Sequence, residues 1–258
     1  MSPKRIVEKA RDKMLNIIGI CDHNSAENIQ YAINAVRTPH LNPFPVKTGK
    51  RKVEGMVCRH SQPFRMADFP CPSLTVLPGM EICTKEEVHI LGIFDELIAV
   101  LKLQELVYQS LPEEKNNPEL FGKQIIANEF DEVEGYNERL LIGASSLSIK
   151  EVIDEIHRLR GIAIASHIDR ESFSIITQLG FIPEELNFDA LEISPNITIE
   201  EANRKFPEIK RFPIIQNSDA HFLEDIGKTV TTFLLEEPNI TEIRKALKGE
   251  NGRAVIYE

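Results

Sequence analysis

The sequence predicts an α/β fold, in which short buried strands alternate with amphipathic helices. Two observations carry this prediction. In the second half of the chain, apolar runs bounded by loop residues alternate with segments of helical periodicity. In the first half, an apolar run at 16–21 leads into polar residues and then into a helical pattern at 26–37. Such alternation is typical of a parallel sheet, barrel-like or doubly wound, which binds ligands at the carboxyl ends of its strands.

The first half of the chain is expected to begin with a helix. Ser2-Pro3 provides a capping hydroxyl followed by proline, so a helix is predicted to about Lys13. Ser25 is expected to cap the helix at 26–37. Further expected elements are strands at 74–77, 78–84 and 87–94, a helix capped by Asp95 that reaches Ser110, and a hairpin formed by 124–128 and 139–142 around an acidic turn at 131–137.

In the second half, Ser148 is expected to cap a helix that ends before Gly161. His157 on this helix is interpreted as a surface or packing residue. The remaining expected elements are strands at 162–166, 189–193, 230–234 and 254–257, the apolar run that leads into Asp-x-His at 214–221, and helices at 172–179, 199–205 and 241–247.

Length and charge exclude several classes of function. At 258 residues the chain can form one (β/α) barrel. The net charge of −10 argues against a broad non-specific nucleic-acid surface, so a long duplex is not an expected partner. No apolar run approaches the roughly 18 residues of a membrane helix, and the N-terminus lacks the apolar core of a signal peptide. The four cysteines have no close pair spacing, which predicts a reduced, cytoplasmic protein.

One segment differs from the rest of the expected single domain at 1–258. Residues 37–73 hold seven Lys or Arg against two Asp or Glu, and six of the fifteen prolines. We interpret them as an irregular basic insertion. His40, Cys58, His60 and Cys71 lie in it at a spacing that does not suit a compact zinc site. A basic flap over an anionic substrate is the alternative interpretation.

Polar residues end several of the predicted strands. They are His23, Glu81, His89, His167, Asp219 and His221. Alone, each could belong to a solvated turn, but the repetition indicates a multi-metal site built from imidazole and carboxylate ligands. Metals held in this way lower the pKa of bound water and neutralise a phosphoryl oxygen. The sequence shows neither a serine or cysteine nucleophile with a paired base nor a glycine-rich phosphate loop.

Five short motifs that contain these residues occur in order between about residues 16 and 234. They are Cys21-Asp22-His23-Asn24, Gly79-x-Glu81, His89-x-x-Gly92-x-Phe94, Ser166-His167 and Ser218-Asp219-Ala220-His221. Their combination resembles the PHP superfamily, the polymerase-and-histidinol-phosphatase-type metal-dependent phosphoesterases.

The resemblance implies a distorted (β/α)7-type barrel around two or three divalent metals, which would be manganese, zinc or iron. By this resemblance the six strand-end residues would be the metal ligands, with Glu81 bridging two metals. Asp22 and Asn24 would orient the loop that carries His23. Asp22 and Arg170 are the implied catalytic residues, and Arg170 and Asn24 the implied substrate contacts. The guanidinium of Arg170 suits a phosphate group because it can donate two parallel hydrogen bonds.

The sequence departs from the family pattern in one respect. Family members open with a His-x-His motif on the first barrel strand, and no His-x-His occurs in these 258 residues. The resemblance therefore implies a barrel without its first strand and without at least two ligands. Either the chain is a fragment or late-start product, which the helix start at Ser2-Pro3 favours, or part of the site has been lost.

The function that follows is a metal-dependent phosphoric ester hydrolase. Its expected substrates are small phosphate monoesters or the ends of nucleotides and short oligonucleotides, attacked by metal-activated water. Without the first motif we expect weak activity or none. A non-catalytic PHP-like module that binds metal, a nucleotide or a partner protein is the alternative. A third hypothesis is an unrelated α/β protein with core histidines. An unfinished barrel edge would favour a homo-oligomer.

Overall fold

The computed structural model describes residues 1–38 and 74–257. The predicted basic insertion at 37–73 lies almost entirely outside these residues, as do His40, Cys58, His60 and Cys71.

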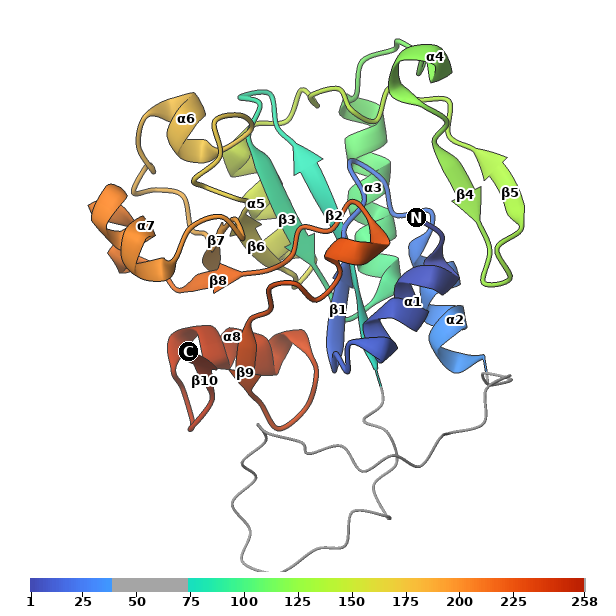
Figure 1. Ribbon diagram of the computed structural model, residues 1–258. Coiled ribbons are helices and arrows are strands. Elements are labelled where there is room, and N and C mark those ends of the chain that lie inside the picture. Colours follow the sequence, from blue (N-terminus) through green and yellow to red (C-terminus); the bar gives the residue numbers. More distant parts are fainter. Residues whose placement is uncertain (39–73, 258) are drawn as a thin grey trace, which may run out of the picture.

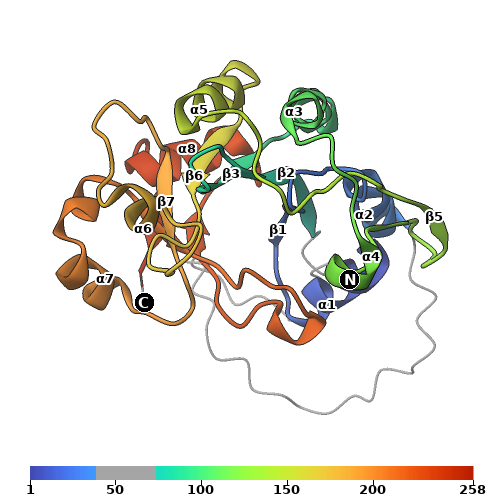
Figure 2. The same cartoon turned by 90° about the horizontal axis from the view of Figure 1, so that it is seen from above.

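A six-stranded sheet forms the centre of the fold, in the order β1-β2-β3-β6-β7-β8. Its strands are β1 (Ile17–Ile20), β2 (Thr75–Cys83), β3 (His89–Ile93), β6 (Ile162–Ala165), β7 (Ala190–Ile193) and β8 (Ile214–Gln216). Viewed from above, the strands follow an arc, so the sheet is curled like part of a barrel wall (Figure 2). The predicted α/β class is confirmed in this form, as a mixed fold around a curled sheet.

The direction of β3 differs from the rest of the sheet. It runs antiparallel to both of its neighbours, whereas the other neighbouring pairs are parallel. The turn between β2 and β3 is closed by a hydrogen bond of 3.0 Å from the Thr84 N–H to the Val88 carbonyl. A turn this short can join only antiparallel strands. The parallel arrangement predicted from the second half of the chain therefore holds for β6, β7 and β8, and β1 and β2 are parallel as well, whereas β3 is the exception.

Helices α2, α3 and α5 lie on the convex side of the sheet, and α8 lies below it (Figures 1 and 2). The helices around the sheet are α1 (Pro3–Asp12), α2 (Ile29–Arg37), α3 (Leu97–Ser110), α5 (Ile149–Arg158), α6 (Ile175–Leu179), α7 (Ile199–Lys205), α8 (Ile240–Lys248) and the 3-10 helices η1 (Pro207–Arg211) and η2 (Leu223–Asp225). Ser148 caps α5 as predicted, in a reciprocal capping box with Glu151.

Strand alternation separates two apolar cores. In β7, Leu191 and Ile193 belong to the core beneath the outer helices, whereas Ala190 belongs to a smaller core on the concave side. Ile240 and Ile243 of α8 are part of that smaller core and close the lower end of the sheet. The concave side is therefore filled by apolar side chains near α8, and polar strand residues collect at the opposite end.

Three predicted helix starts are a few residues too early. The hydroxyl of Ser25 does not cap α2, because it lies 3.1 Å from the Tyr108 hydroxyl. Asp95 does not cap α3 either. Its carboxylate accepts a hydrogen bond of 2.8 Å from the N–H of Ile240, at the start of α8. The side chains of Ser25 and Asp95 both contact residues far away in the sequence, and such contacts cannot be predicted from the local sequence pattern. The predicted start of α6 is early as well, since Ser174 is its N-cap.

Two small antiparallel sheets lie outside the central one. They pair β4 (Ile125–Ala127) with β5 (Val133–Tyr136), and β9 (Thr232–Leu234) with β10 (Ala254–Ile256). Helix α4 (Pro118–Phe121) precedes β4. The predicted hairpin exists, but its second strand is β5 and not 139–142. The turn is tighter than predicted because the Asn128 side-chain oxygen accepts hydrogen bonds from the N–H groups of Phe130 and Glu132, at 2.9 and 3.0 Å.

Among the described residues, no helix combines the length and the apolar character needed to cross a membrane.

Candidate metal centre

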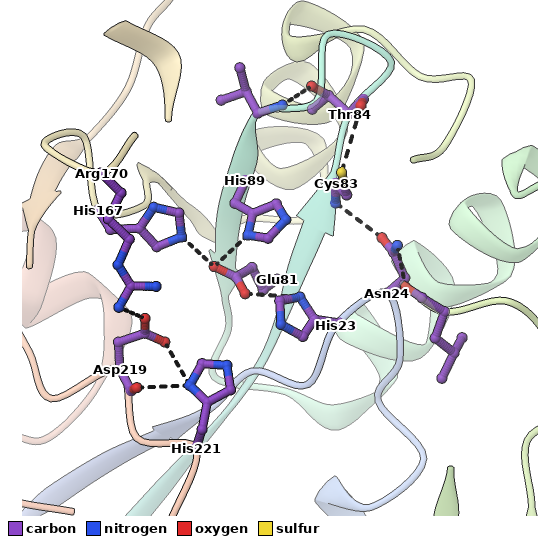
Figure 3. A network of polar contacts seen from close by, with 12 residues as sticks. His23, Asn24, Glu81, Cys83, Thr84, His89, His167, Arg170, Asp219 and His221 are labelled. Carbon is purple, nitrogen blue, oxygen red and sulfur yellow. Dashed lines mark hydrogen bonds and ion pairs between the residues drawn. The ribbon is translucent and has the colours of Figure 1, made fainter. Parts of the chain in front are cut away.

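The six polar residues predicted at strand ends lie together at one end of the sheet (Figure 3). Five of them follow strands or lie near their carboxyl ends, namely His23, Glu81, His167, Asp219 and His221. His89 is instead the first residue of β3. Because β3 is antiparallel, its amino end lies beside the carboxyl ends of its neighbours. The sheet therefore brings all six side chains to the same end.

The carboxylate of Glu81 lies between three imidazoles. Its Oε2 atom is 3.1 Å from His23 Nδ1, and its Oε1 atom is 3.4 Å from His89 Nδ1 and 3.5 Å from His167 Nε2. Glu81 points to the concave side because both of its neighbours in β2 pack into the outer core. At 5% exposure the carboxylate has little contact with water, so its charge depends on these partners.

The ionisation of this group suits metal binding. Burial alone would raise the pKa of Glu81, but the close imidazoles of His167, His89 and His23 hold that pKa well below its usual range. Burial lowers the pKa of His23. An ionised carboxylate beside a neutral imidazole is the protonation state that metal ligation requires.

Buried polar atoms without a partner also gather here. Among the described residues, His89 Nδ1, His167 Nδ1 and Ser166 Oγ are buried and form no hydrogen bond, the contact of His89 with Glu81 lacking hydrogen-bond geometry. Such atoms are costly, and a cluster of them indicates a missing partner. His23, Glu81 and His89 offer ligand atoms that all lie within 4.8 Å of one another. Imidazole and carboxylate are ligands of zinc, manganese and iron, so the donor set fits a divalent metal.

Asp219 and His221 form a second group beside the first. The ring centroids of His23 and His221 are 6.0 Å apart. His221 Nδ1 lies 3.0 Å from the backbone oxygen of Asp219 and 3.8 Å from its Oδ1. The guanidinium of Arg170 contacts the other carboxylate oxygen, Oδ2, at 2.5 Å (Figure 3). The predicted phosphate-binding residue is therefore paired with a predicted metal ligand.

Three residues of the site have a left-handed backbone. The φ angles are 49° at Asn24, 29° at His167 and 43° at Asp219. This region is uncommon for residues other than glycine, and strained backbone of this kind collects at functional sites. Each strained residue lies in the loop that follows a strand of the sheet. The backbone itself therefore helps to set the directions of these side chains.

The side chain of Asn24 binds backbone groups of neighbouring segments. It is fully buried, its Nδ2 donates to the carbonyls of Leu141 and Gly143 at 2.9 Å each, and its Oδ1 accepts from the N–H of Cys83 at 3.1 Å. These bonds use both amide hydrogens and the amide oxygen of Asn24. They hold the loop that carries His23, the orienting role expected of Asn24.

Asp22, the other predicted residue of this loop, is bonded toward the start of α2. Its Oδ2 accepts a hydrogen bond of 3.3 Å from Asn28, the residue that precedes α2. Burial raises the pKa of Asp22, and the hydrogen bond from Asn28 partly offsets this effect.

Glu192 is a site residue that the sequence interpretation missed. It is 4% exposed in β7 and accepts a hydrogen bond of 2.8 Å from Asn217. Burial, reinforced by the charges of Glu81 and Asp219, raises the pKa of Glu192 to about 7. The available signal was a single carboxylate in an apolar strand, the same signal that identified Glu81.

Known proteins resemble this chain in part of the sequence and in the fold. Residues 202–251, which include Asp219 and His221, match the PHP-associated family. No curated protein matches the sequence. The lesion-specific endonuclease EndoQ of Pyrococcus furiosus is similar with a TM-score of 0.59 at 20% identity, over 99% of this chain and 53% of that chain. A structure of endonuclease Q with a 27-mer duplex substrate, which has an abasic lesion at the active site, gives a TM-score of 0.60 at 20% identity and the same coverage.

A protein of Bifidobacterium adolescentis assigned as a metal-dependent phosphoesterase is similar with a TM-score of 0.55 at 15% identity, over 96% of this chain and 91% of that chain. At such identities the likeness establishes the fold. The chain spans about half of the endonuclease chains, 53% of their length. The family match and the fold together confirm the predicted resemblance to the PHP superfamily.

Proposed function

We propose that this protein is a metal-dependent phosphoesterase built on a distorted (β/α)7-type barrel. The observation that carries the proposal is the convergence of three imidazoles on the buried carboxylate of Glu81, with Asp219 and His221 beside them. This donor set suits a cluster of divalent ions. The similar fold of an endonuclease and of a protein assigned as a phosphoesterase supports the choice of phosphate-ester chemistry.

Two or three ions of manganese, zinc or iron would be held by the six predicted ligands, with Glu81 shared between two of them. When bound, such ions lower the pKa of water and neutralise charge on phosphoryl oxygens. Arg170 would bind two phosphate oxygens through its planar guanidinium. Asp22 would act in catalysis from the same loop as His23. Asn24 would keep that loop in place.

The proposed substrate is a phosphate ester of a nucleotide or nucleic acid. The expectation that long duplexes are excluded was based on the net charge of −10 alone. An endonuclease of similar fold is solved with a 27-mer duplex, which argues against that exclusion. Duplex DNA therefore belongs among the substrates to be tested, together with small phosphate monoesters.

The test is manganese-dependent hydrolysis of three substrates by the wild-type protein and two variants. The substrates are p-nitrophenyl phosphate, bis-p-nitrophenyl phosphate and a labelled duplex with an abasic site. His89→Ala is expected to abolish turnover, whereas His157→Ala should retain it, because His157 pairs with Asp189 at 2.8 Å outside the site. Equal rates in both variants and the wild type would rule out this centre as the source of activity.

The non-catalytic alternative remains a distinct outcome of the same experiment. If manganese raises the melting temperature of the wild type but none of the three substrates is hydrolysed, the protein is a metal-binding module. A protein that responds to metal in neither assay would favour the third hypothesis, in which the histidines are core residues.

A further inference from the structure

The ion pair between Arg170 and Asp219 joins two residues that have different tasks in the proposed function. We propose that Arg170 competes with the metal for Asp219 and is released to bind substrate phosphate only when metal is present. This inference rests on the proposed function and adds an order to it, in which metal binding prepares the phosphate site.

The backbone of Arg170 is fixed, whereas its partly exposed side chain can change rotamer. Its N–H donates to the carbonyl of His167 at 3.0 Å, and its own carbonyl accepts from the hydroxyls of Ser174 and Thr177 at 2.9 and 2.8 Å. The side chain is 37% exposed. The guanidinium can therefore leave Asp219 by rotation about its side-chain bonds, while the loop after β6 stays in place.

Asp219, in contrast, is held in position. Its backbone has the left-handed φ of 43°, and its carbonyl lies 3.0 Å from His221 Nδ1. The preceding Ser218 hydroxyl donates to the carbonyl of Thr229 at 2.8 Å and accepts from the N–H of Gly227 at 3.1 Å. The Asp219 side chain is 19% exposed; among the described residues its buried Oδ2 accepts no hydrogen bond, and the only ion-pair partner of this atom is the guanidinium of Arg170. Because this carboxylate is held in place, the metal ion and the guanidinium of Arg170 must compete for it.

Electrostatics favours exchange over sharing. A divalent cation and a guanidinium repel each other, and a partly buried site screens this repulsion poorly. Metal at Asp219 therefore weakens the pair with Arg170. A phosphate group bound at the centre would then attract the released guanidinium through two charge-assisted hydrogen bonds. By linkage, phosphate must strengthen metal binding by the same factor by which metal strengthens phosphate binding.

Calorimetric titration with Mn²⁺ alone tests the competition. We expect Arg170→Ala to bind Mn²⁺ about fivefold more tightly than the wild type, or more, in the range usual for coupled sites. Arg158→Ala is the matched control, since Arg158 also pairs with a carboxylate at 2.5 Å, that of Glu155, but lies on the exposed side of α5. It carries the same change of charge and should bind Mn²⁺ as the wild type does.

A second titration, in the presence of inorganic phosphate, tests the release. Phosphate should tighten Mn²⁺ binding more in the wild type than in Arg170→Ala, which keeps only the direct contact of phosphate with the metal. Equal or weaker Mn²⁺ binding by Arg170→Ala would overturn the inference and show that Arg170 supports Asp219 as a ligand. A wild type that binds no Mn²⁺, or an Asp219→Asn variant that binds it as tightly as the wild type, would overturn the assignment of the metal centre itself.

Discussion

The side chain of Asn217 donates a hydrogen bond of 2.8 Å to the carboxylate of Glu192, although the two residues belong to different strand ends of the concave face. The pKa of Glu192 is about 7 in the folded protein and 4.5 without the fold, so the folded state binds the extra proton between these values. The stabilising contribution is complete below about pH 4.5 and is lost as the pH rises through about 7. For this interval we expect a loss of about 3 kcal/mol in the free energy of unfolding.

Urea denaturation in the presence of a chelator measures this loss at pH 5 and pH 8. Glu192→Gln is the informative variant, because glutamine does not ionise and its carbonyl can still accept from Asn217. The wild type should lose more stability than Glu192→Gln over this range. Parallel pH profiles of the two proteins would show that Glu192 is ionised throughout.

Metal should stabilise the folded protein. A ligand that binds only the folded state raises the free energy of unfolding by about 3 kcal/mol at a hundredfold excess over its Kd. Mn²⁺ is therefore expected to raise the melting temperature of the wild type and of His157→Ala, but not that of His89→Ala or Glu81→Gln. Differential scanning fluorimetry with and without Mn²⁺ is sufficient. A shift that persists in His89→Ala would place the bound metal elsewhere.

Substitution of Asn24 should lower the free energy of unfolding more than most substitutions outside the metal ligands. Asn24→Ala and Asn24→Gly both remove three side-chain hydrogen bonds, which is expected to cost about 3 kcal/mol. Alanine should cost about 1 kcal/mol more than glycine, because the backbone at this position has a φ of 49°. The two variants are compared by urea denaturation. Equal stabilities would mean that the loop relaxes out of the left-handed conformation.

The effects of substitutions at Gly79 and Cys21, near the metal centre, on the free energy of unfolding should be coupled. A Cβ atom at Gly79 would lie 2.4 Å from Cys21 Sγ, and 3.1 Å from the carbonyl oxygen of Gly92. Gly79→Ala is therefore expected to destabilise the protein by about 2 kcal/mol. Cys21→Ala should recover part of this loss, because it removes the closest atom, and a double-mutant cycle measures the coupling. Additive effects would indicate that the strand backbones, and not the thiol, limit the space.

The parts of the fold that the sequence predicted well are those governed by local rules. Ser148 caps helix α5 as predicted, in a capping box, and α7 spans 199–205 as predicted. The direction of β3 was not predictable in this way, because a histidine at the start of an apolar run looks the same as one at its end. The side chain of Asp95 was assigned to the nearest helix, but it accepts a hydrogen bond from the N–H of Ile240 at the start of α8, 145 residues further along the chain.

The same division applies to the site. His23, Glu81 and His167 were recognisable because each interrupts or ends an apolar run. Phe173 was not, although its ring stacks on His89 with a centroid distance of 4.6 Å. Nothing in its own neighbourhood distinguishes it from other aromatic residues, because the contact depends on how the loop after β6 folds back. The pairing of Arg170 with Asp219 was hidden for the same reason, since it requires the relative position of two loops.

The left-handed backbone at Asn24, His167 and Asp219 affects how substitution experiments on this centre are interpreted. Replacing His167 by alanine removes the imidazole. It also leaves alanine, which has no polar side chain to stabilise it, in a left-handed backbone conformation. Lost activity would therefore have two causes. Asparagine tolerates this conformation well. His167→Asn therefore removes the imidazole at a smaller conformational cost, and the difference between the two variants separates the chemistry of the ligand from the shape of the chain that carries it.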